Sequence, residues 1–442
     1  MKSNNENALL DKMKFCVHTI LNICILAGLS ACASPNVYHF NSVLEQYEDA
    51  KTVDVYLDAY GMVYPKTGIA YDYSPELKYG GELQRAATDP QSRLCQTNIG
   101  GDLSEMCAGG ASEWDNIQTQ RWAKTVKDIS NLFKEDSKNK ALVVLIHGFN
   151  VDNPKRDYRI AQARIREIDE NKTDFVFLRV HWDGSKNPVI TRAWSKAQYS
   201  GPLVGFRMRE FYNLLVDENF GNVKPSVHVL THSSGAFITS ATFGNPISAL
   251  PRLSEKTETP NHYDEFKESL ITKSKKRFIP EIENLHIGML APAIPSGSVT
   301  GYVKRIPDNT DASKYTAAKT GGFYAADRGW KTSNSHISFS VNPKDEALSN
   351  KGVFSANFSF LGAKGVGAKK KTYCFIEDWD STESKNTVVS GFDFTRAQDD
   401  QANGILPKSH AFADYLTQKA STPFLKQFLG YRVQDVHYIN CD

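Results

Sequence analysis

The residue best suited to chemistry is Ser233, which lies in the segment THSSG at positions 231–235. A run at 227–230 with the composition of a buried strand precedes this segment, and small residues follow it. A serine flanked by small residues two positions before and two after can occupy a tight strand-to-helix turn in which larger side chains would collide. That turn would raise the hydroxyl above a sheet and direct a helix N-terminus at developing negative charge. We therefore predict that Ser233 is a nucleophile, although Thr231 occupies a position more often held by glycine.

A second pattern, HGFN at 147–150, follows another apolar run. Gly148 would let the backbone turn so that the N–H of Phe149 points at a reacting carbonyl oxygen, and the N–H of Ser234 would be the second donor. His147 could instead be a core histidine at the end of a strand. Because the THSSG segment follows further along the chain, in the required order, the sequence favours an oxyanion-binding loop.

A serine nucleophile of this kind needs an acid after it in the chain. Asp345 lies just beyond the predicted strand 337–341, where it could hold an imidazole in the correct tautomer and stabilise the imidazolium. Glu346 and Asp327 are the alternatives. Glu346 would point elsewhere if a helix starts there, and Asp327 precedes the strand, so we expect the acid to be Asp345.

The base must be a histidine after the acid. His410 lies near the start of the last helical stretch, ahead of Tyr415 and Leu416. His437 is the alternative, but it stands in a short apolar run, where a core histidine is the more usual occurrence. The expected base is therefore His410.

Apolar runs alternating with amphipathic stretches predict a mostly parallel α/β sheet that positions these residues. The first helix would begin near Ser112, and the second would be capped at Asn153 and Pro154. Two segments resemble insertions: 252–283 is densely charged, and 353–371 is rich in glycine and lysine. The first is expected to be a solvated excursion, and the second a mobile loop or a substrate lid. Strands are expected near 53–57 and at 141–146, 175–182, 227–231, 285–294, 337–341 and 372–376; further helices are expected at 190–218 and from 234.

Together these motifs resemble a bacterial family of uncharacterised α/β-hydrolases. The likeness covers about residues 138–429. It is carried by HGFN at 147–150, Trp182, THSSG at 231–235, Leu-Ala-Pro at 290–292, Asp-Glu-Ala-Leu at 345–348, and Ser409-His410. It implies an α/β-hydrolase fold with a Ser233–Asp345–His410 triad. Such a serine hydrolase is expected to act on ester, thioester or amide bonds, of which esters are favoured by analogy with the fold. This chemistry requires no metal ion and no organic cofactor.

The N-terminus is similar to a bacterial lipoprotein signal. Lys12 and Lys14 precede an apolar stretch at 15–29, and Leu-Ser-Ala-Cys at 29–32 ends it. The resemblance implies cleavage before Cys32, lipidation of that cysteine and, since Ala33 follows, sorting to the outer membrane facing the periplasm. A cleaved soluble signal or a buried helix is the alternative, and Met13 is an alternative start. The expected organisation is a signal at 1–31, a tether and irregular N-terminal cap at 32–110, and a hydrolase domain at 111–442.

Seven cysteines are an odd number for a chain expected to form disulfides. The leader would remove Cys16 and Cys24, and lipidation would use Cys32. The four that remain are Cys95, Cys107, Cys374 and Cys441, which allow three pairings in an oxidising compartment. They form no Cys-x-x-Cys pair, so a structural zinc site is not expected.

The composition limits the classes of function. Fifty-two basic and 50 acidic residues give a net charge of +2, which argues against a dedicated nucleic-acid binder. A mean hydropathy of −0.43 argues against a multi-span membrane protein. The expected partners are a small-molecule or lipid acyl-ester substrate and a bilayer reached through acylated Cys32. Two further interpretations stay open: a non-catalytic envelope protein that uses the fold for binding, and an acyltransferase or peptidase with the same triad.

Overall fold

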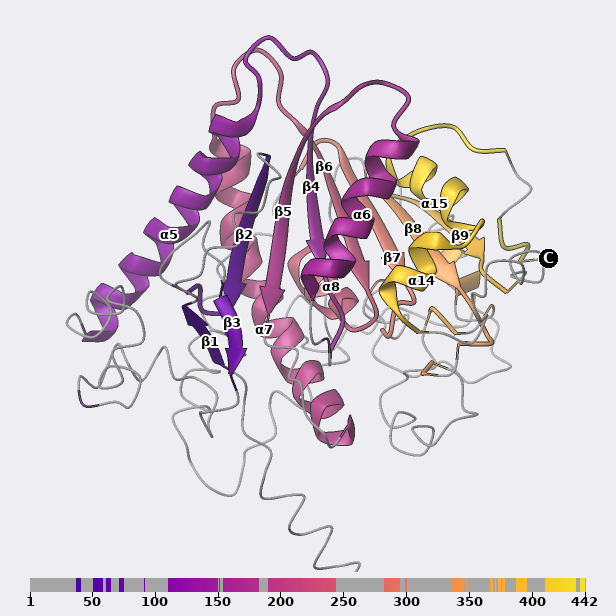
Figure 1. The fold of residues 1–442 in the computed structure, drawn as a ribbon, viewed down its shortest axis with the longest axis horizontal. Helices are drawn as coiled ribbons and strands as arrows, with labels where there is room; N and C mark the ends of the chain where they lie inside the picture. The colour runs from indigo at the N-terminus through magenta and orange to yellow at the C-terminus, as the bar shows by residue number, and fades with distance from the viewer. Residues whose placement is uncertain are drawn as a thin grey trace, which may run out of the picture.

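A seven-stranded, all-parallel sheet forms the centre of the protein (Figure 1). The strand order is β2-β5-β4-β6-β7-β8-β9. The sequence-based prediction of a mostly parallel α/β sheet is therefore confirmed. The strands are β2 (Thr52–Leu57), β4 (Lys140–Ile146), β5 (Asp174–Trp182), β6 (Ser226–His232), β7 (Leu285–Leu290), β8 (Ser335–Val341) and β9 (Thr387–Asp393). A separate antiparallel pair joins β1 (Val37–Phe40) and β3 (Tyr71–Ser74).

This computed structural model describes part of the chain. The described residues are 37–40, 51–58, 61–64, 71–74, 91, 110–149, 151, 154–182, 190–243, 282–294, 299, 335–345, 347–348, 366–368, 370, 373–374, 376–377, 387–395, 410–434 and 438–441. The expected signal at 1–31, Cys32, Cys95 and Cys107 lie outside these residues, as does nearly all of the charged segment 252–283. No helix within the described ranges is long and apolar enough to cross a membrane.

Helices cover both faces of the sheet (Figure 1). One face carries α6 (Pro154–Ile168), α14 (Phe412–Thr417) and α15 (Ser421–Phe428). The other carries α5 (Gly110–Leu132), α7 (Ile190–Asp217) and α8 (Gly235–Phe243). Strand β4 lies in the middle of this sheet and is shielded on both faces, so it is almost entirely apolar and all seven of its residues are buried.

The order of the strands reverses between β4 and β6. The chain passes from β4 outward to β5 and then returns across β4 to β6. Ligands of open α/β sheets bind at the carboxyl ends of the strands where the order reverses in this way. The segments that follow β4 and β6 are 147–150 and 233–235, the two motifs to which the sequence points.

Two sequence-based boundaries are corrected. The run 372–376 was expected to be a strand, but Tyr373, Cys374 and Ile376 are helical, and the last strand is β9. The Tyr373 ring lies over β9 at Gly391, so closely that any side chain at Gly391 would overlap it. The strand expected at 285–294 ends at Leu290, because Ala291 has a positive φ of 47° that interrupts the extended backbone.

Two segments expected to lie outside the central layers make contact with the sheet. Strand β2, from the range expected to form the N-terminal cap, pairs in parallel with β5. At the end of the glycine- and lysine-rich stretch, 366–368 are buried. There Gly367 N–H donates to Pro292 O (3.2 Å), and Asn342 N–H donates to Gly367 O (2.8 Å). The rest of the segment 353–371 lies outside the described residues, apart from residue 370.

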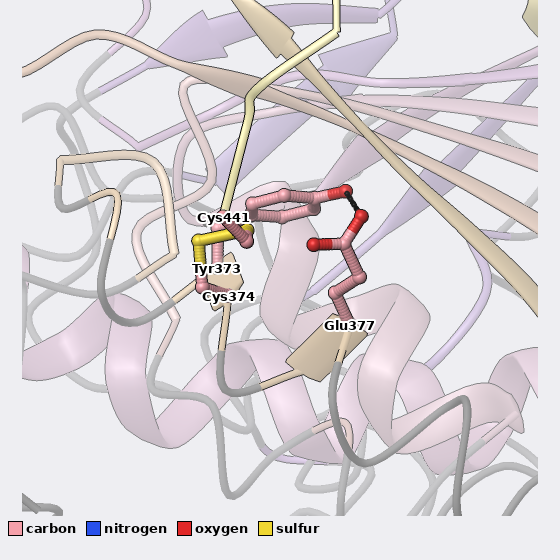
Figure 2. The surroundings of a disulfide bond; sticks show 4 residues. All are labelled: Tyr373, Cys374, Glu377 and Cys441. Carbon is pink, nitrogen blue, oxygen red and sulfur yellow. Dashed lines mark hydrogen bonds between the residues drawn. A yellow bond between two sulfur atoms is a disulfide. The ribbon is translucent and has the colours of Figure 1, made fainter. Parts of the chain in front are cut away.

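A disulfide joins Cys374 to Cys441, one of the pairings that the cysteine count allowed (Figure 2). It fastens the C-terminal segment beside β9, where Ile439 N–H donates to Gly391 O (2.7 Å) and Tyr438 forms an antiparallel bridge with Phe392. Pairing of this kind covers an edge strand that would otherwise be open to another chain.

We expect removal of this disulfide to destabilise the protein without changing the order of its strands. The bond spans 67 residues, and closing a loop of this size restricts the unfolded chain. Replacing both cysteines by serine should lower the free energy of unfolding by about 2 to 4 kcal/mol, measured by denaturant titration. A reductant should lower the midpoint of the native protein by more than that of the double variant, which retains only the proposed pair of Cys95 and Cys107. Equal midpoints for the native protein with and without reductant would contradict the prediction.

Candidate active site

Ser233 occupies the turn between β6 and α8 and is 2% exposed. Its φ is 52°, a left-handed conformation that side-chain-bearing residues rarely adopt. Hydrogen bonds fix this backbone: Ser233 N–H donates to Leu290 O (2.9 Å), and Ser233 O accepts from Ala293 N–H (3.2 Å). Strain of this kind persists only where the surroundings over-determine the conformation, and it is common at functional sites.

The turn also needs small neighbours. A Cβ added at Gly235 would lie 2.7 Å from His147 O, closer than real Cβ contacts occur. Thr231, the departure noted in the sequence, is the penultimate residue of β6 and is fully buried between β4 and β7. Its hydroxyl is buried with no hydrogen-bond partner in the described part of the chain. A threonine is therefore accommodated at this position.

The structure brings Ser233, His410 and Asp345 into one hydrogen-bonded chain. Ser233 Oγ lies 2.7 Å from His410 Nε2, and His410 Nδ1 lies 2.8 Å from Asp345 Oδ2. One imidazole tautomer satisfies both contacts: Nε2 accepts from the serine hydroxyl, and Nδ1–H donates to the carboxylate. The His410 side chain is 21% exposed, whereas Ser233 is 2% exposed and Asp345 is fully buried. The imidazole therefore stands between the buried acid and solvent.

The Asp345 carboxylate is saturated with hydrogen-bond donors. Oδ1 accepts from the N–H groups of Ala347 (3.0 Å) and Leu348 (3.1 Å). Oδ2 accepts from His410 and from the hydroxyl of Tyr415 (2.6 Å). Burial raises the pKa of the Tyr415 phenol well above its usual value, so the hydroxyl remains a donor. Four donors fix the carboxylate in one orientation.

Tyr415 was missed as a site residue by the sequence reasoning. It lies on α14, one turn beyond His410, and was read only as part of the helix that follows the base. The sequence carries no signal for this contact, because His410 precedes the helix and a spacing of five residues does not place two side chains on one helix face.

His147 is a buried histidine whose contacts fix the loop after β4. The ring is 1% exposed, its Nδ1 lies 2.6 Å from Gly148 O, and its Nε2 accepts from Trp182 N–H (3.3 Å). Trp182 Nε1–H donates to His147 O (2.9 Å), and His147 N–H donates to the hydroxyl of Tyr158 (3.0 Å). Burial lowers the pKa of His147 to about 3, so the ring is neutral and donates from Nδ1. His147 thus positions the loop and does not itself face solvent.

Gly148 brings this loop directly against the serine turn. A Cβ added at Gly148 would lie 3.0 Å from Ser233 Cβ and 3.1 Å from His232 Nδ1, tighter than most real Cβ contacts. Phe149 is partly buried against the core. On the serine side, Ser234 O accepts from Phe237 N–H (2.9 Å), while the N–H of Ser234 has no acceptor within the described ranges. The two expected oxyanion donors, Phe149 and Ser234, thus belong to segments that lie beside Ser233.

The alternatives weighed for the acid and the base, Glu346, Asp327 and His437, lie outside the described residues. For metal ions, one group of three potential ligands occurs in the described part of the chain: Cys374, Glu377 and Cys441 (Figure 2). Both sulfurs of this group form the disulfide and are not thiolates.

Comparison with known proteins adds nothing to the geometry of the site described above. No protein-family model matches the chain, and neither a curated protein nor a solved structure was found to match it.

Proposed function

We propose that this protein is a serine hydrolase of the α/β-hydrolase fold that cleaves carboxylic esters through an acyl-enzyme. The observation that carries the proposal is the continuous hydrogen-bonded chain from Ser233 through His410 to Asp345, set on a turn with positive φ. A serine next to a base that a third group orients is the arrangement that activates a hydroxyl for nucleophilic attack.

In the proposed reaction, Ser233 Oγ bonds to the ester carbonyl carbon while its proton moves to His410 Nε2. The N–H groups of Phe149 and Ser234 stabilise the negative charge on the carbonyl oxygen. His410 then donates the proton to the leaving alcohol oxygen as the ester C–O bond breaks. Water, activated by the same imidazole, attacks the acyl-enzyme and releases the acid.

Asp345 acts by holding the imidazole and by balancing its positive charge. In this mechanism Asp345 remains a carboxylate throughout the reaction, and its four hydrogen-bond donors keep it in place. Esters are the proposed substrates because this type of site most often transfers acyl groups from them, which is an argument from fold-level analogy. The reaction requires neither a metal ion nor an organic cofactor.

We further propose that the protein works at the cell envelope, anchored through acylated Cys32 to the outer membrane and facing the periplasm. Two or three acyl chains would hold it firmly, since each buried CH₂ contributes about 0.8 kcal/mol. The disulfide between Cys374 and Cys441 supports an oxidising compartment. With that pair formed, Cys95 and Cys107 are left to form the second. A lipid or another acylated envelope component would then be within reach of the site.

An active-site-directed fluorophosphonate probe tests the proposed function. We expect the native protein to be labelled and Ser233→Ala to be unlabelled, because only Ser233 Oγ is activated by His410. Ser240→Ala is the matched control: Ser240 is also buried, lies on α8, and among the described residues its hydroxyl donates to Phe237 O. It should be labelled like the native protein.

Equal labelling of the native protein and Ser233→Ala would overturn the proposal, and absence of labelling in both would favour a non-catalytic binding protein. Where labelling is specific, hydrolysis of esters of increasing acyl length by the native protein would define the acyl group. Transfer to an added alcohol or amine would distinguish an acyltransferase.

A further inference from the structure

His232, the last residue of β6, has a buried imidazole at the centre of the candidate site. His232 is 4% exposed. Its ring lies flat on Phe412, with the centroids 5.1 Å apart and the planes at 12°, and its centroid is 5.0 Å from that of His410, with the planes at 45°. His232 Nδ1 is 3.1 Å from the position that a Cβ would take at Gly148. The ring therefore packs against both the loop after β4 and the segment that carries His410.

Packing on Phe412 is the main contact of this ring. Neither of its nitrogens makes a hydrogen bond of normal geometry to a described residue, and the weak interaction with the His410 main chain falls outside that geometry. Buried polar atoms without partners carry a free-energy penalty and call for an explanation. Burial lowers the pKa of His232 well below its usual value, and the charge on nearby His410 lowers it further, which outweighs the opposite effect of the His410 main chain. His232 therefore stays neutral when His410 accepts a proton, and adds no second positive charge to the site.

We propose that His232 is a positioning residue whose flat ring sets the spacing between the oxyanion loop at Gly148 and the base His410. This inference rests on the proposed function, because it assigns the two segments their catalytic roles. Acyl transfer requires both at once, since the loop must meet the carbonyl oxygen while the base meets Ser233. A displacement of about 1 Å between such groups can cost roughly 100-fold in rate.

The shape of the ring is what the site requires. Phenylalanine keeps a flat face for Phe412 and has no buried nitrogen without a partner, so His232→Phe should preserve the spacing. Leucine fills a similar volume but cannot stack on Phe412. We expect His232→Leu to lower kcat for an activated aryl ester by roughly 10- to 100-fold, with KM nearly unchanged, because the ring does not contact the substrate.

His228 supplies a matched control on the same strand. It is also a buried histidine of lowered pKa, on the same face of β6, but its ring packs on His286 and Phe428 at the opposite end. His228→Leu should reduce stability while leaving kcat unchanged. A second readout is independent of turnover: the downfield proton resonance of His410 Nδ1–H in its hydrogen bond to Asp345, identified by its loss in His410→Gln.

The inference is supported if His232→Leu loses kcat and the downfield resonance while His232→Phe and His228→Leu keep both. It is overturned if His232→Leu keeps both, if His232→Phe loses as much as His232→Leu, or if His228→Leu reduces kcat equally. If the native protein neither reacts with the probe nor hydrolyses esters, the proposed function fails. The resonance then decides alone whether His232 holds His410 in place.

Discussion

Asp345→Asn is expected to lower kcat for an activated ester by about 10⁴-fold while leaving the fold intact. The structure specifies how the amide would sit. Oδ1 of Asp345 accepts from two main-chain N–H groups, those of Ala347 and Leu348, so the amide oxygen of asparagine must take this position. Its NH₂ group then replaces Oδ2, facing His410 and Tyr415.

An NH₂ group at that position reverses the hydrogen bond to the base. It donates to His410 Nδ1, which must then carry the lone pair, and the ring proton moves to Nε2. Nε2–H faces Ser233 Oγ and cannot accept its proton. The variant would therefore keep the three residues in place with the wrong tautomer, which removes general-base catalysis and the balance of charge.

Steady-state kinetics of the purified protein would measure this loss, with thermal unfolding to show that the variant is folded. Tyr415→Phe is the graded control, because it removes one of the four donors to Asp345 and leaves its charge unchanged. A charge-assisted hydrogen bond of this kind is worth about 1.5 to 3 kcal/mol, so a loss of kcat of up to roughly 10- to 150-fold is expected, still well short of the loss in Asp345→Asn. A kcat for Asp345→Asn within tenfold of the native value would exclude Asp345 as the residue that orients His410.

The free energy of unfolding should fall steeply as the pH is lowered from 6.5 to about 4, by at least about 2 kcal/mol per pH unit from the stacked histidines alone. Three histidines at matching positions of β6, β7 and β8 stack in a row: His228, His286 and His336. The ring centroids are 4.7 and 5.1 Å apart and the planes are within 12° of parallel. Burial is the main cause that lowers each pKa, to about 4 for His228 and about 3 for His286.

The direction of the effect follows from proton binding. The rings of His228 and His286 have a pKa near 6.5 in the unfolded chain and a lower pKa in the folded protein. Below pH 6.5 the unfolded chain therefore binds more protons than the folded protein. Their stabilising contribution is complete above pH 6.5 and is lost as the pH falls toward the folded values. Each ring contributes about 1 kcal/mol per pH unit in this interval. Contacts with His181 and Arg179 lower the pKa of the buried Asp54 carboxylate to about 2. This group therefore adds a further loss of stability only below pH 4.

Denaturant midpoints measured at half-unit steps of pH would test this dependence. His286→Leu is the informative variant, because Nδ1 of His286 has no hydrogen-bond partner among the described residues and leucine has no titratable group. Its stability should change less steeply between pH 6.5 and 4, by about one proton. A native protein equally stable at pH 7 and pH 4.5 would contradict the prediction.

Much of the fold could be read from the sequence because its signals are local. Apolar runs between amphipathic stretches gave the right type of element for the strands from β4 to β8 and for the helices between β4 and β6. The exception was the short run 372–376, which is helical. A short apolar run with residues of high β-propensity does not distinguish strand from helix by itself. Packing of Tyr373 over Gly391 accompanies the helical form here.

In the candidate site, too, the residues with local sequence signals could be predicted and the contacts between distant residues could not. Ser233, Asp345 and His410 each stand where a strand ends or a helix is about to begin, and the sequence could name them from turn chemistry and order alone. The structure places their side chains in hydrogen-bonding contact, while their catalytic roles remain predictions. The supporting contacts could not be anticipated, because they join residues that are distant in the chain: Tyr415 to Asp345, and Trp182 to His147.

By itself, therefore, the sequence determined the class of fold and the order of the chemical groups along the chain. The tertiary structure decided which residues support those groups, which strands lie at the edges and that Cys374 pairs with Cys441. The physical reason is that strand order and register bring distant segments together. Whether a buried imidazole such as His147 or His232 has a hydrogen-bond partner depends on those segments, and no local pattern records it.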